Sequence, residues 1–324
     1  MLKLLAVFSL CSAAVAAPCA STKPDCTEWL TLGGGPSRSL VYRTFPLGVR
    51  NPAITRALIM VHGAGRDADN YFRTTLAAAF LAGALEDTIV ISPRFASRDG
   101  KGCADALAAN EVNWSCSGDS WRSGGVALDN KALTSYDFTD EILRKLARKD
   151  VFPKLKAIVV AGHSAGGQYV TRYEMSNKVH DRLGVPVTYV VSNPSSYAYL
   201  DAARPGGTAP AGCAAYDNWP YGIEKRSGYT ASVPDGQLKK QLAERPVTYL
   251  LGQIDILPLG GFDSSCSAMA QGPTRLARGE AFGKYVNEKY GAHHSVTVVS
   301  LCGHNARCMF TAEAALPIIF PAVQ

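Results

Sequence analysis

The sequence lacks clustered charge, and beyond its first seventeen residues it also lacks a hydrophobic run long enough to cross a membrane. Charged residues make up only 19% of the 324 residues, and the lysines and arginines behind the net charge of +6 are scattered. Nucleic-acid-binding proteins instead gather their basic residues into a stripe or patch. We therefore expect no nucleic-acid partner and no membrane span, whereas a mild positive charge is compatible with anionic substrates.

Internal repeats and low-complexity linkers are also absent. Hydrophobic residues make up 47% of the chain, which is enough to bury a substantial core. The composition predicts one large catalytic domain, for which the expected bounds are residues 18–324.

The one long apolar stretch stands at the beginning of the chain, in MLKLLAVFSLCSAAVAA. It carries an early positive charge at Lys3 and ends in small residues at Ala16 and Ala17. This is the layout of a secretory signal peptide, although a buried N-terminal strand or helix is an alternative. We predict a signal peptide over residues 1–17 and, after its removal, a soluble extracellular monomer.

Cysteine is plentiful for a chain of this kind. Of the nine cysteines, Cys11 leaves with the predicted signal peptide, and an even number remains, as expected for an exported protein with disulfides. Sequence does not fix the connectivity, but close spacing favours three pairs and leaves the last two cysteines for each other. The expected pairs are Cys19 with Cys26, Cys103 with Cys116, Cys302 with Cys308, and Cys213 with Cys266. Asn113, in NWS, is the candidate glycosylation site.

Strand-like and helix-like segments alternate along the chain. Six apolar or β-branched runs have the length of strands: ALIMVH, TIVISP, KAIVVAG, VTYVVSN, PVTYLLG and SVTVVSL. Continuous runs of this kind are typical of parallel strands buried on both faces. Helices are expected at 70–85, 135–148, 167–178 and 274–290, and TEWLTL and SLVYRTF predict an antiparallel hairpin at the sheet edge. The fold class is therefore α/β, with a mostly parallel sheet and helices on both faces.

One stretch, residues 195–244, departs from this alternation. It is rich in Gly, Pro, Tyr and Trp and too long for a plain connection. We interpret it as an excursion over the carboxyl edge of the sheet, where ligands bind in open α/β sheets. A surface loop with a purely structural role is the alternative.

The motif GHSAGG places Ser164 between the strand-like KAIVVAG and a helical segment. A nucleophile elbow has this order, and small residues at Gly162 and Gly166 allow strand and helix to approach closely. A serine hydroxyl needs a base to remove its proton, so Ser164 requires a histidine partner.

Position along the chain selects the base and the acid. His304 follows the last predicted strand, whereas His293 and His294 precede it and His180 lies at the far end of the helix after Ser164. The acid expected after an earlier strand is Asp255, in GQID, with Asp201 and Asp263 as runners-up. Asp255 would orient His304 and stabilise its protonated form.

Two backbone amides are expected to bind the oxyanion. One belongs to Ala165, the residue after Ser164, and the other to Ala64 in the loop HGAGRDADNYF, with Gly65 or Arg66 as alternatives. His62 is interpreted as a residue that holds this loop rather than as a base.

A metal site is the competing interpretation of the segment CGHNARC. Cys302, His304 and Cys308 form a ligand-like set, but in an exported chain a disulfide around the catalytic histidine is favoured. We expect no metal and no organic cofactor.

The motifs GHSAGG, HGAG, GQID and CGHN, in this order, resemble those of the α/β-hydrolase superfamily over essentially the whole chain after residue 17. The strings GHSAGGQYVTRY and SNPSSYAYL are similar to a group of secreted serine hydrolases, and the HGGG motif of some lipases is absent. The resemblance implies an α/β-hydrolase fold and a serine esterase that acts on a small or polymeric ester. A peptidase or amidase on the same fold is one alternative, and a non-catalytic binding module is another.

Overall fold

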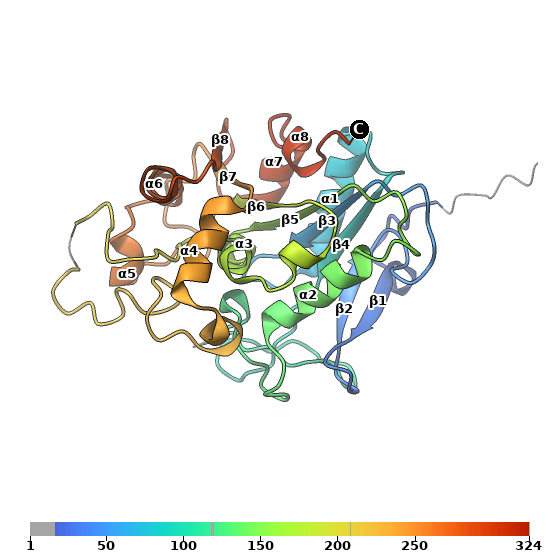
Figure 1. The fold of residues 1–324 in the computed structure, drawn as a ribbon, viewed down its shortest axis with the longest axis horizontal. Coiled ribbons are helices and arrows are strands. Elements are labelled where there is room, and N and C mark those ends of the chain that lie inside the picture. The colour runs from blue at the N-terminus through green and yellow to red at the C-terminus, as the bar shows by residue number, and fades with distance from the viewer. Residues whose placement is uncertain (1–16, 118–119, 208, 324) are drawn as a thin grey trace, which may run out of the picture.

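Eight strands form one mixed sheet at the centre of the computed structural model, which describes residues 17–117, 120–207 and 209–323 (Figure 1). The strand order is β1-β2-β4-β3-β5-β6-β7-β8. The strands are β1 (Thr27–Thr31), β2 (Arg38–Arg43), β3 (Arg56–Val61), β4 (Thr88–Pro93), β5 (Ala157–His163), β6 (Val187–Ser192), β7 (Val247–Gly252) and β8 (Ser295–Val299). β1 and β2 pair antiparallel, β2 pairs antiparallel with β4, and all other pairs are parallel. The predicted fold class is confirmed.

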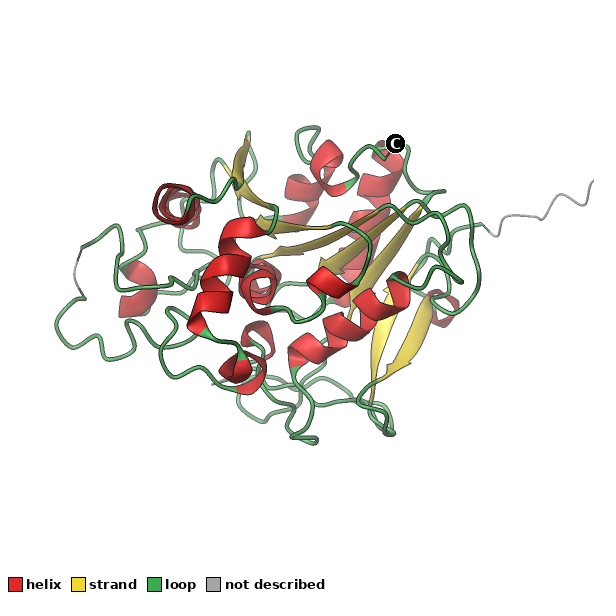
Figure 2. Ribbon diagram, in the orientation of Figure 1, coloured by secondary structure: helices red, strands yellow, loops and turns green. Residues whose placement is uncertain are grey.

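Helices cover both faces of this sheet (Figure 2). The longer helices are α1 (Ala68–Leu81), α2 (Ser135–Leu146), α3 (Ala165–Ser176), α4 (Asp235–Glu244) and α6 (Arg275–Tyr290). The shorter helices are α5 (Cys266–Met269), α7 (Ala306–Thr311), α8 (Leu316–Ile319), η1 (Pro24–Cys26), η2 (Trp121–Ser123), η3 (His180–Arg182) and η4 (Gly228–Ser232). The four helices predicted from periodicity are therefore present, with bounds shifted by a few residues.

Alternate side chains of the central strands pack into two separate cores. In β3, Ile59 and Val61 join the core shared with α2, α3, α4 and α6, whereas Leu58 and Met60 join the core under α1, α7 and α8. Successive side chains of a strand point to opposite faces, so a continuous apolar run supplies both cores.

One expectation about the C-terminal half was wrong in detail. β8 is not buried on both faces, because it forms the edge of the sheet and leaves Val296 and Val298 exposed. Segment 195–244 contains η4 and ends in α4, which packs against α3. An apolar run shows that a strand is favoured, but only the strand order decides whether both faces are covered.

Four disulfides join the cysteine pairs expected from spacing: Cys19–Cys26, Cys103–Cys116, Cys213–Cys266 and Cys302–Cys308. They are consistent with an extracellular protein. The predicted signal peptide lies outside the described residues except for Ala17, and it stays a prediction. Within the described ranges, none of the helices has the length and apolar character to span a membrane.

Candidate active site

Four loops at the carboxyl edge of the sheet carry the residues that sequence analysis singled out. Ser164 follows β5, Ala64 follows β3, Asp255 follows β7 and His304 follows β8. These strands run parallel, so their carboxyl ends meet at one edge.

Ser164 stands on a sharp turn between β5 and α3. Its backbone has φ 59° and ψ −118°, a region that L-residues rarely adopt, and its amide donates to the Ser192 carbonyl 2.9 Å away. A Cβ on Gly166 would lie 2.2 Å from the Val61 carbonyl oxygen, and one on Gly162 would lie 2.3 Å from the Gly166 oxygen. Glycine is therefore required at both positions, and the turn holds the Ser164 hydroxyl above the sheet edge.

The three predicted side chains form one chain of hydrogen bonds. Ser164 Oγ lies 2.9 Å from His304 Nε2, and His304 Nδ1 lies 2.7 Å from Asp255 Oδ2. If Nδ1 donates to the carboxylate, Nε2 is free to accept the serine proton. The structure thus brings Ser164, His304 and Asp255 together in the order that nucleophilic catalysis requires.

A buried arginine, Arg275 of α6, lies behind Asp255. Its Nη1 is 3.5 Å from Asp255 Oδ1, and neither side chain of this pair is more than 1% exposed. Arg275 also donates to the carbonyls of Leu259 and Gly260, and a Cβ at Gly260 would lie 3.6 Å from His304 Cδ2. One guanidinium therefore fixes both the acid and the loop beside the base.

Asn193, just after β6, connects the acid and base loops. Its Oδ1 accepts a hydrogen bond from Gly252 N at 2.8 Å, and its Nδ2 donates to Gly303 O at 3.3 Å. The Cys302–Cys308 disulfide encloses His304 from the other side of the loop. Because these two sulfurs are bonded to each other, they do not form the metal-ligand set with His304 that was the alternative interpretation.

The loop after β3 lies against the serine turn. A Cβ at Gly63 would lie 3.7 Å from Ser164 Cβ and 2.8 Å from the Tyr71 hydroxyl. In the part of the chain that the structure describes, the amide N–H groups of Ala64 and Ala165 donate to no protein acceptor. Both amides are thus available to an oxyanion, and Ala165 also begins α3, where the helix dipole favours negative charge.

His62 holds this loop, as the sequence suggested. Its Nε2 accepts from the Phe95 amide at 3.0 Å, and its Nδ1 donates to the Gly63 carbonyl at 2.9 Å. Burial lowers the pKa of His62 to about 4, so the ring is neutral at pH 7.

His163 lies directly beside the candidate base. Its ring centroid is 4.6 Å from that of His304, and its Nδ1 is hydrogen-bonded to the Tyr71 hydroxyl at 3.1 Å. Burial, followed by the charges of His304 and Arg275, holds the pKa of His163 well below its usual value. His163 therefore stays neutral and places no like charge beside a protonated His304.

A cavity of about 530 Å³ opens above Ser164. It is lined by the loop after β3, by α1, by Gly260 and Gly261, and by the segment from His304 to Arg307. No described residue of segment 195–244 lines this cavity, and the interpretation of the segment as an excursion over the carboxyl edge of the sheet stays a prediction. The segment contacts one of the lining loops, since Ser195 Oγ donates to the Gly261 carbonyl at 3.3 Å.

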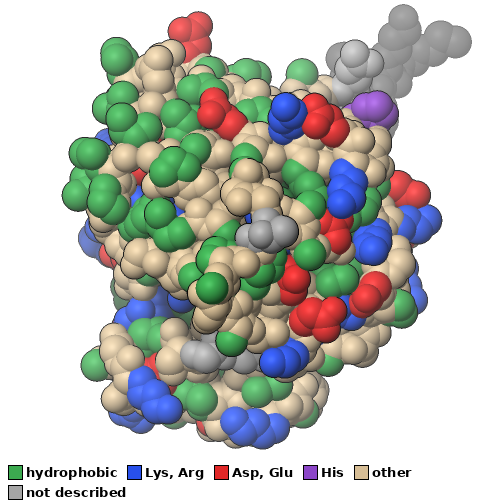
Figure 3. Space-filling view, turned by 90° about the vertical axis from the view of Figure 1, so that its left-hand side faces the viewer, with side chains coloured by type: hydrophobic (Ala, Val, Ile, Leu, Met, Phe, Trp, Pro, Cys, Tyr) green, Lys and Arg blue, Asp and Glu red, His purple; other side chains and the backbone are tan. Residues whose placement is uncertain are grey.

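Large aliphatic side chains are exposed on the loops next to this cavity. Ile254, Ile256, Leu257 and Leu259 follow β7 and are 50–60% exposed, and Leu301, which follows β8, is 81% exposed. Ile254 N donates to the Cys302 carbonyl, so the two loops are adjacent. Figure 3 views the molecule from the side of α5 and α6 and shows hydrophobic side chains gathered on one part of that surface.

The alternative histidines and carboxylates lie in other contacts. His180 is hydrogen-bonded to Tyr189 of β6, and His294 is hydrogen-bonded to Tyr249 of β7. Both tyrosines lie in the amino-terminal half of their strands, away from the carboxyl edge that carries Ser164. Asp201 binds Lys289, and Asp263 accepts from Tyr221. The Asn113 side chain, half-buried, exchanges hydrogen bonds with the Arg98 backbone, and its glycosylation stays a prediction.

Sequence reasoning missed Arg275, Tyr71 and the roles of His163 and Asn193. Arg275 stands in an ordinary helical segment, where nothing distinguishes it from a surface residue, and Tyr71 stands in the quoted string HGAGRDADNYF, in which no role was assigned to it. His163 and Asn193 stand inside quoted motifs, and their position at strand ends was the one signal that pointed to the site.

Comparisons with known proteins bear on the family and the fold. The model of the alpha/beta hydrolase family matches residues 58–314. Poly(aspartic acid) hydrolase-1 from Sphingomonas sp. KT-1 is similar in structure, with a TM-score of 0.65 and 22% identity over 91% of this chain and 97% of that one. LpqC, a poly(3-hydroxybutyrate) depolymerase from Bordetella parapertussis, gives a TM-score of 0.64 and 20% identity over 90% of this chain and 89% of that one. No curated protein matches the sequence significantly. The family match covers most of the chain, and the protein therefore belongs to the alpha/beta hydrolase family.

Proposed function

We propose that this protein is a secreted serine hydrolase that cleaves carboxylic esters through an acyl-enzyme on Ser164. The observation that carries the proposal is the chain of contacts from Ser164 Oγ to His304 Nε2, at 2.9 Å, and from His304 Nδ1 to Asp255, at 2.7 Å. The unbonded amides of Ala64 and Ala165 support it, because an acyl transfer needs donors for the developing oxyanion.

In the proposed reaction, Ser164 Oγ attacks the ester carbonyl while its proton passes to His304 Nε2. The carbonyl oxygen becomes an oxyanion held by the amides of Ala64 and Ala165. The tetrahedral intermediate collapses, the C–O bond to the alcohol breaks, and His304 returns the proton to the leaving alcohol. Water then attacks the acyl-enzyme with His304 as base, and Ser164 is regenerated.

The substrate is proposed to be a small or a polymeric ester. The two structural neighbours are named for their action on poly(aspartic acid) and poly(3-hydroxybutyrate), but at 22% and 20% identity they share only the fold with this chain. The exposed aliphatic side chains next to the cavity support an ester with apolar parts. Four disulfides support export.

Replacement of Ser164 tests the mechanism. Ser164→Ala is expected to abolish hydrolysis of a p-nitrophenyl ester and labelling by a fluorophosphonate probe. Ser232→Ala is the matched control, because Ser232 is an exposed serine in η4, and it is expected to keep both. Full activity in folded Ser164→Ala would rule out the acyl-enzyme, and an unlabelled wild type would favour a binding module.

A peptidase or amidase would use the same hydrogen-bonded residues, because amides and esters share the tetrahedral intermediate. Purified protein is therefore to be compared on acyl esters and on short peptides of matched acyl groups. We expect a higher kcat/KM on esters, and a higher value on peptides would replace esterase by peptidase.

A further inference from the structure

A second, smaller cavity of about 220 Å³ is lined by Ala64 and Ala165, the two residues whose amides are the candidate oxyanion donors. Ala64 lines both cavities, whereas Ser164 and His304 line only the larger one. The walls of the smaller cavity include Trp121 and three cations, Arg66, Lys101 and Arg122. We call this second cavity the cationic cleft.

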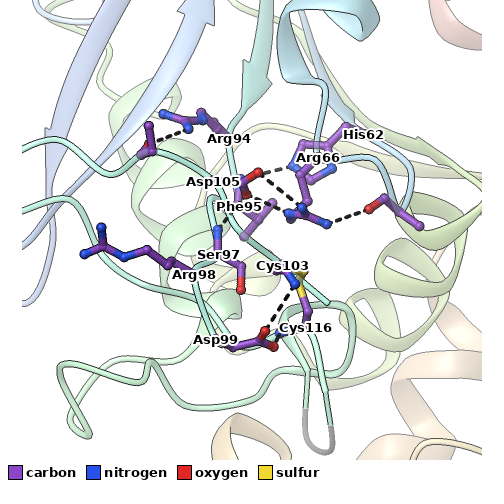
Figure 4. A network of polar contacts seen from close by, with 12 residues as sticks. His62, Arg66, Arg94, Phe95, Ser97, Arg98, Asp99, Cys103, Asp105 and Cys116 are labelled. Carbon is purple, nitrogen blue, oxygen red and sulfur yellow. Dashed lines mark hydrogen bonds and ion pairs between the residues drawn. A yellow bond between two sulfur atoms is a disulfide. The ribbon is translucent and has the colours of Figure 1, made fainter. Parts of the chain in front are cut away.

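The two carboxylates near the cleft already have partners. Asp105 binds Arg66 through two contacts, of 2.7 and 3.1 Å, and accepts from the Ser97 amide (Figure 4). Asp99 accepts from the backbone amides of Lys101, Cys103 and Cys116. Arg66 is thus neutralised by Asp105, and the carboxylate of Asp99 faces backbone N–H groups.

Arg122 and Lys101 have no such partner. Among the described residues neither forms an ion pair, and the one side-chain contact of the Arg122 guanidinium is the neutral Gln168 amide oxygen at 3.4 Å. Arg122 belongs to η2, which packs against α3, and its side chain is half-buried. Another cation, Arg172, lies deeper, and burial, together with the charge of Arg122, lowers its pKa to about 10. Hydrogen bonds from neutral amides do not cancel the charge of Asp99, so Arg122 and Lys101 together leave the described residues around the cleft with a net excess of one positive charge.

The position of His304 decides which half of an ester enters the cleft. The leaving alcohol must lie within hydrogen-bonding reach of His304 Nε2 to receive its proton. His304 lines the large cavity and not the cleft, so the alcohol belongs in the large cavity. The acyl part then extends past the Ala64 and Ala165 amides toward Arg122.

We propose that the cationic cleft binds an anionic group, a carboxylate, at the far end of the acyl part, so that the preferred substrates are esters of dicarboxylic acids with one free carboxylate. This proposal rests on the proposed esterase function. Arg122 presents a planar set of N–H donors that matches a carboxylate, and Trp121 provides an apolar wall for the intervening methylene groups.

A matched pair of substrates tests the proposal. Mono-p-nitrophenyl adipate carries the free carboxylate, and p-nitrophenyl methyl adipate is its neutral counterpart. The wild-type enzyme is expected to show a kcat/KM about tenfold higher on the anionic ester, as one charge-assisted hydrogen-bonded contact provides. The ratio of kcat/KM on the anionic ester to kcat/KM on the neutral ester is expected to fall as the salt concentration is raised, because a half-exposed cation is screened.

Variants at Arg122 and a control assign the preference to the cleft. Arg122→Gln is expected to bring the ratio close to one, Arg122→Lys to keep part of it, and Lys101→Gln to lower it less. Arg98→Gln is the matched control and is expected to leave the ratio unchanged. Arg98 is an exposed arginine in the same segment that does not line the cleft, and its side chain points away from Arg66 in Figure 4.

The outcomes separate the two proposals. A wild-type ratio near one, or an unchanged ratio in folded Arg122→Gln, overturns the cationic cleft while leaving the esterase intact. If Arg122→Gln does not fold, the salt dependence of the wild-type ratio and Lys101→Gln decide in its place. Absence of hydrolysis of both esters, with Ser164 unlabelled by a fluorophosphonate, overturns the esterase itself.

Discussion

Ser164 lies between an acid side, which carries Asp255, and an oxyanion side, which carries Ala64. Each side contains an arginine–aspartate ion pair and a disulfide, and the two ion pairs differ in burial. On the acid side, Arg275 and Asp255 are 3.5 Å apart and fully buried. On the oxyanion side, Arg66 and Asp105 are 2.7 Å apart, and their side chains are 13% and 22% exposed.

The ion pair with the shorter N···O distance is not the one whose loss is expected to destabilise the protein more. Removing one partner of a buried pair leaves an uncompensated charge away from water, whereas solvent and salt screen a charge near the surface. The acid side therefore depends on its ion pair. The oxyanion side depends more on His62, which joins Gly63 to Phe95.

The largest effect is expected from Arg275→Met. It leaves the Asp255 carboxylate buried without its cation and removes the donors to Leu259 and Gly260. We expect a loss of about 3–5 kcal/mol in the free energy of unfolding, measured by denaturant titration, and a lower kcat. Arg275→Met/Asp255→Asn is expected to recover stability but not activity. An Arg275→Met protein as stable as wild type would remove the distinction between the two sides.

The next effect concerns pH on the oxyanion side. The folded protein holds the pKa of His62 at about 4, below the value of about 6.5 in an unfolded chain, because burial disfavours the charged ring. The unfolded state then binds more protons between these values, so stability is full above pH 6.5 and is lost as pH falls toward 4.

The expected contribution of His62 is about 3 kcal/mol between pH 7 and pH 4. His62→Gln is expected to show a shallower loss of stability over this range than wild type, measured as the free energy of unfolding at each pH. Parallel curves for the two proteins would contradict a neutral, buried His62.

The disulfide around His304 is expected to affect catalysis more than stability. Cys302→Ser/Cys308→Ser removes a bridge of sequence separation 6, for which chain entropy gives about 2–3 kcal/mol. A base displaced by about 1 Å loses on the order of a hundredfold in rate, so kcat is expected to fall more than the melting temperature suggests. Lost stability with unchanged kcat would mean that the bridge only tethers the C-terminal segment.

The smallest effect is expected from Arg66→Gln. The Arg66–Asp105 pair is partly exposed, and its loss is expected to cost about 0–1 kcal/mol in denaturant titration, less at high salt. A loss as large as that of Arg275→Met would show that the two pairs are equivalent.

Local patterns predicted most of the elements that position the site. The apolar runs became β3 to β8, and the order of Ser164, Asp255 and His304 along the chain corresponds to the ends of β5, β7 and β8. These predictions depend on neighbours in sequence, because the periods of strands and helices and the glycines at a tight turn are local requirements.

Other features could not be predicted because they depend on contacts between distant residues. The exposure of β8 follows from its place at the sheet edge, and the contact between Ser195 and Gly261 joins two segments that are far apart in the sequence. Nothing near Arg275 in the sequence indicates that α6 directs it toward Asp255, 20 residues away.

The sequence by itself determined the strand–helix alternation and the serine turn, and it indicated the cysteine pairs and the residues that meet at the sheet edge. Only the tertiary structure decided which ion pair is buried, that Asp105 neutralises Arg66 near the Ala64 amide, and which cations stay unpaired among the residues that the structure describes. The physical reason is that burial and charge compensation are properties of a site assembled from several loops, whereas periodicity and turn chemistry are written in consecutive residues.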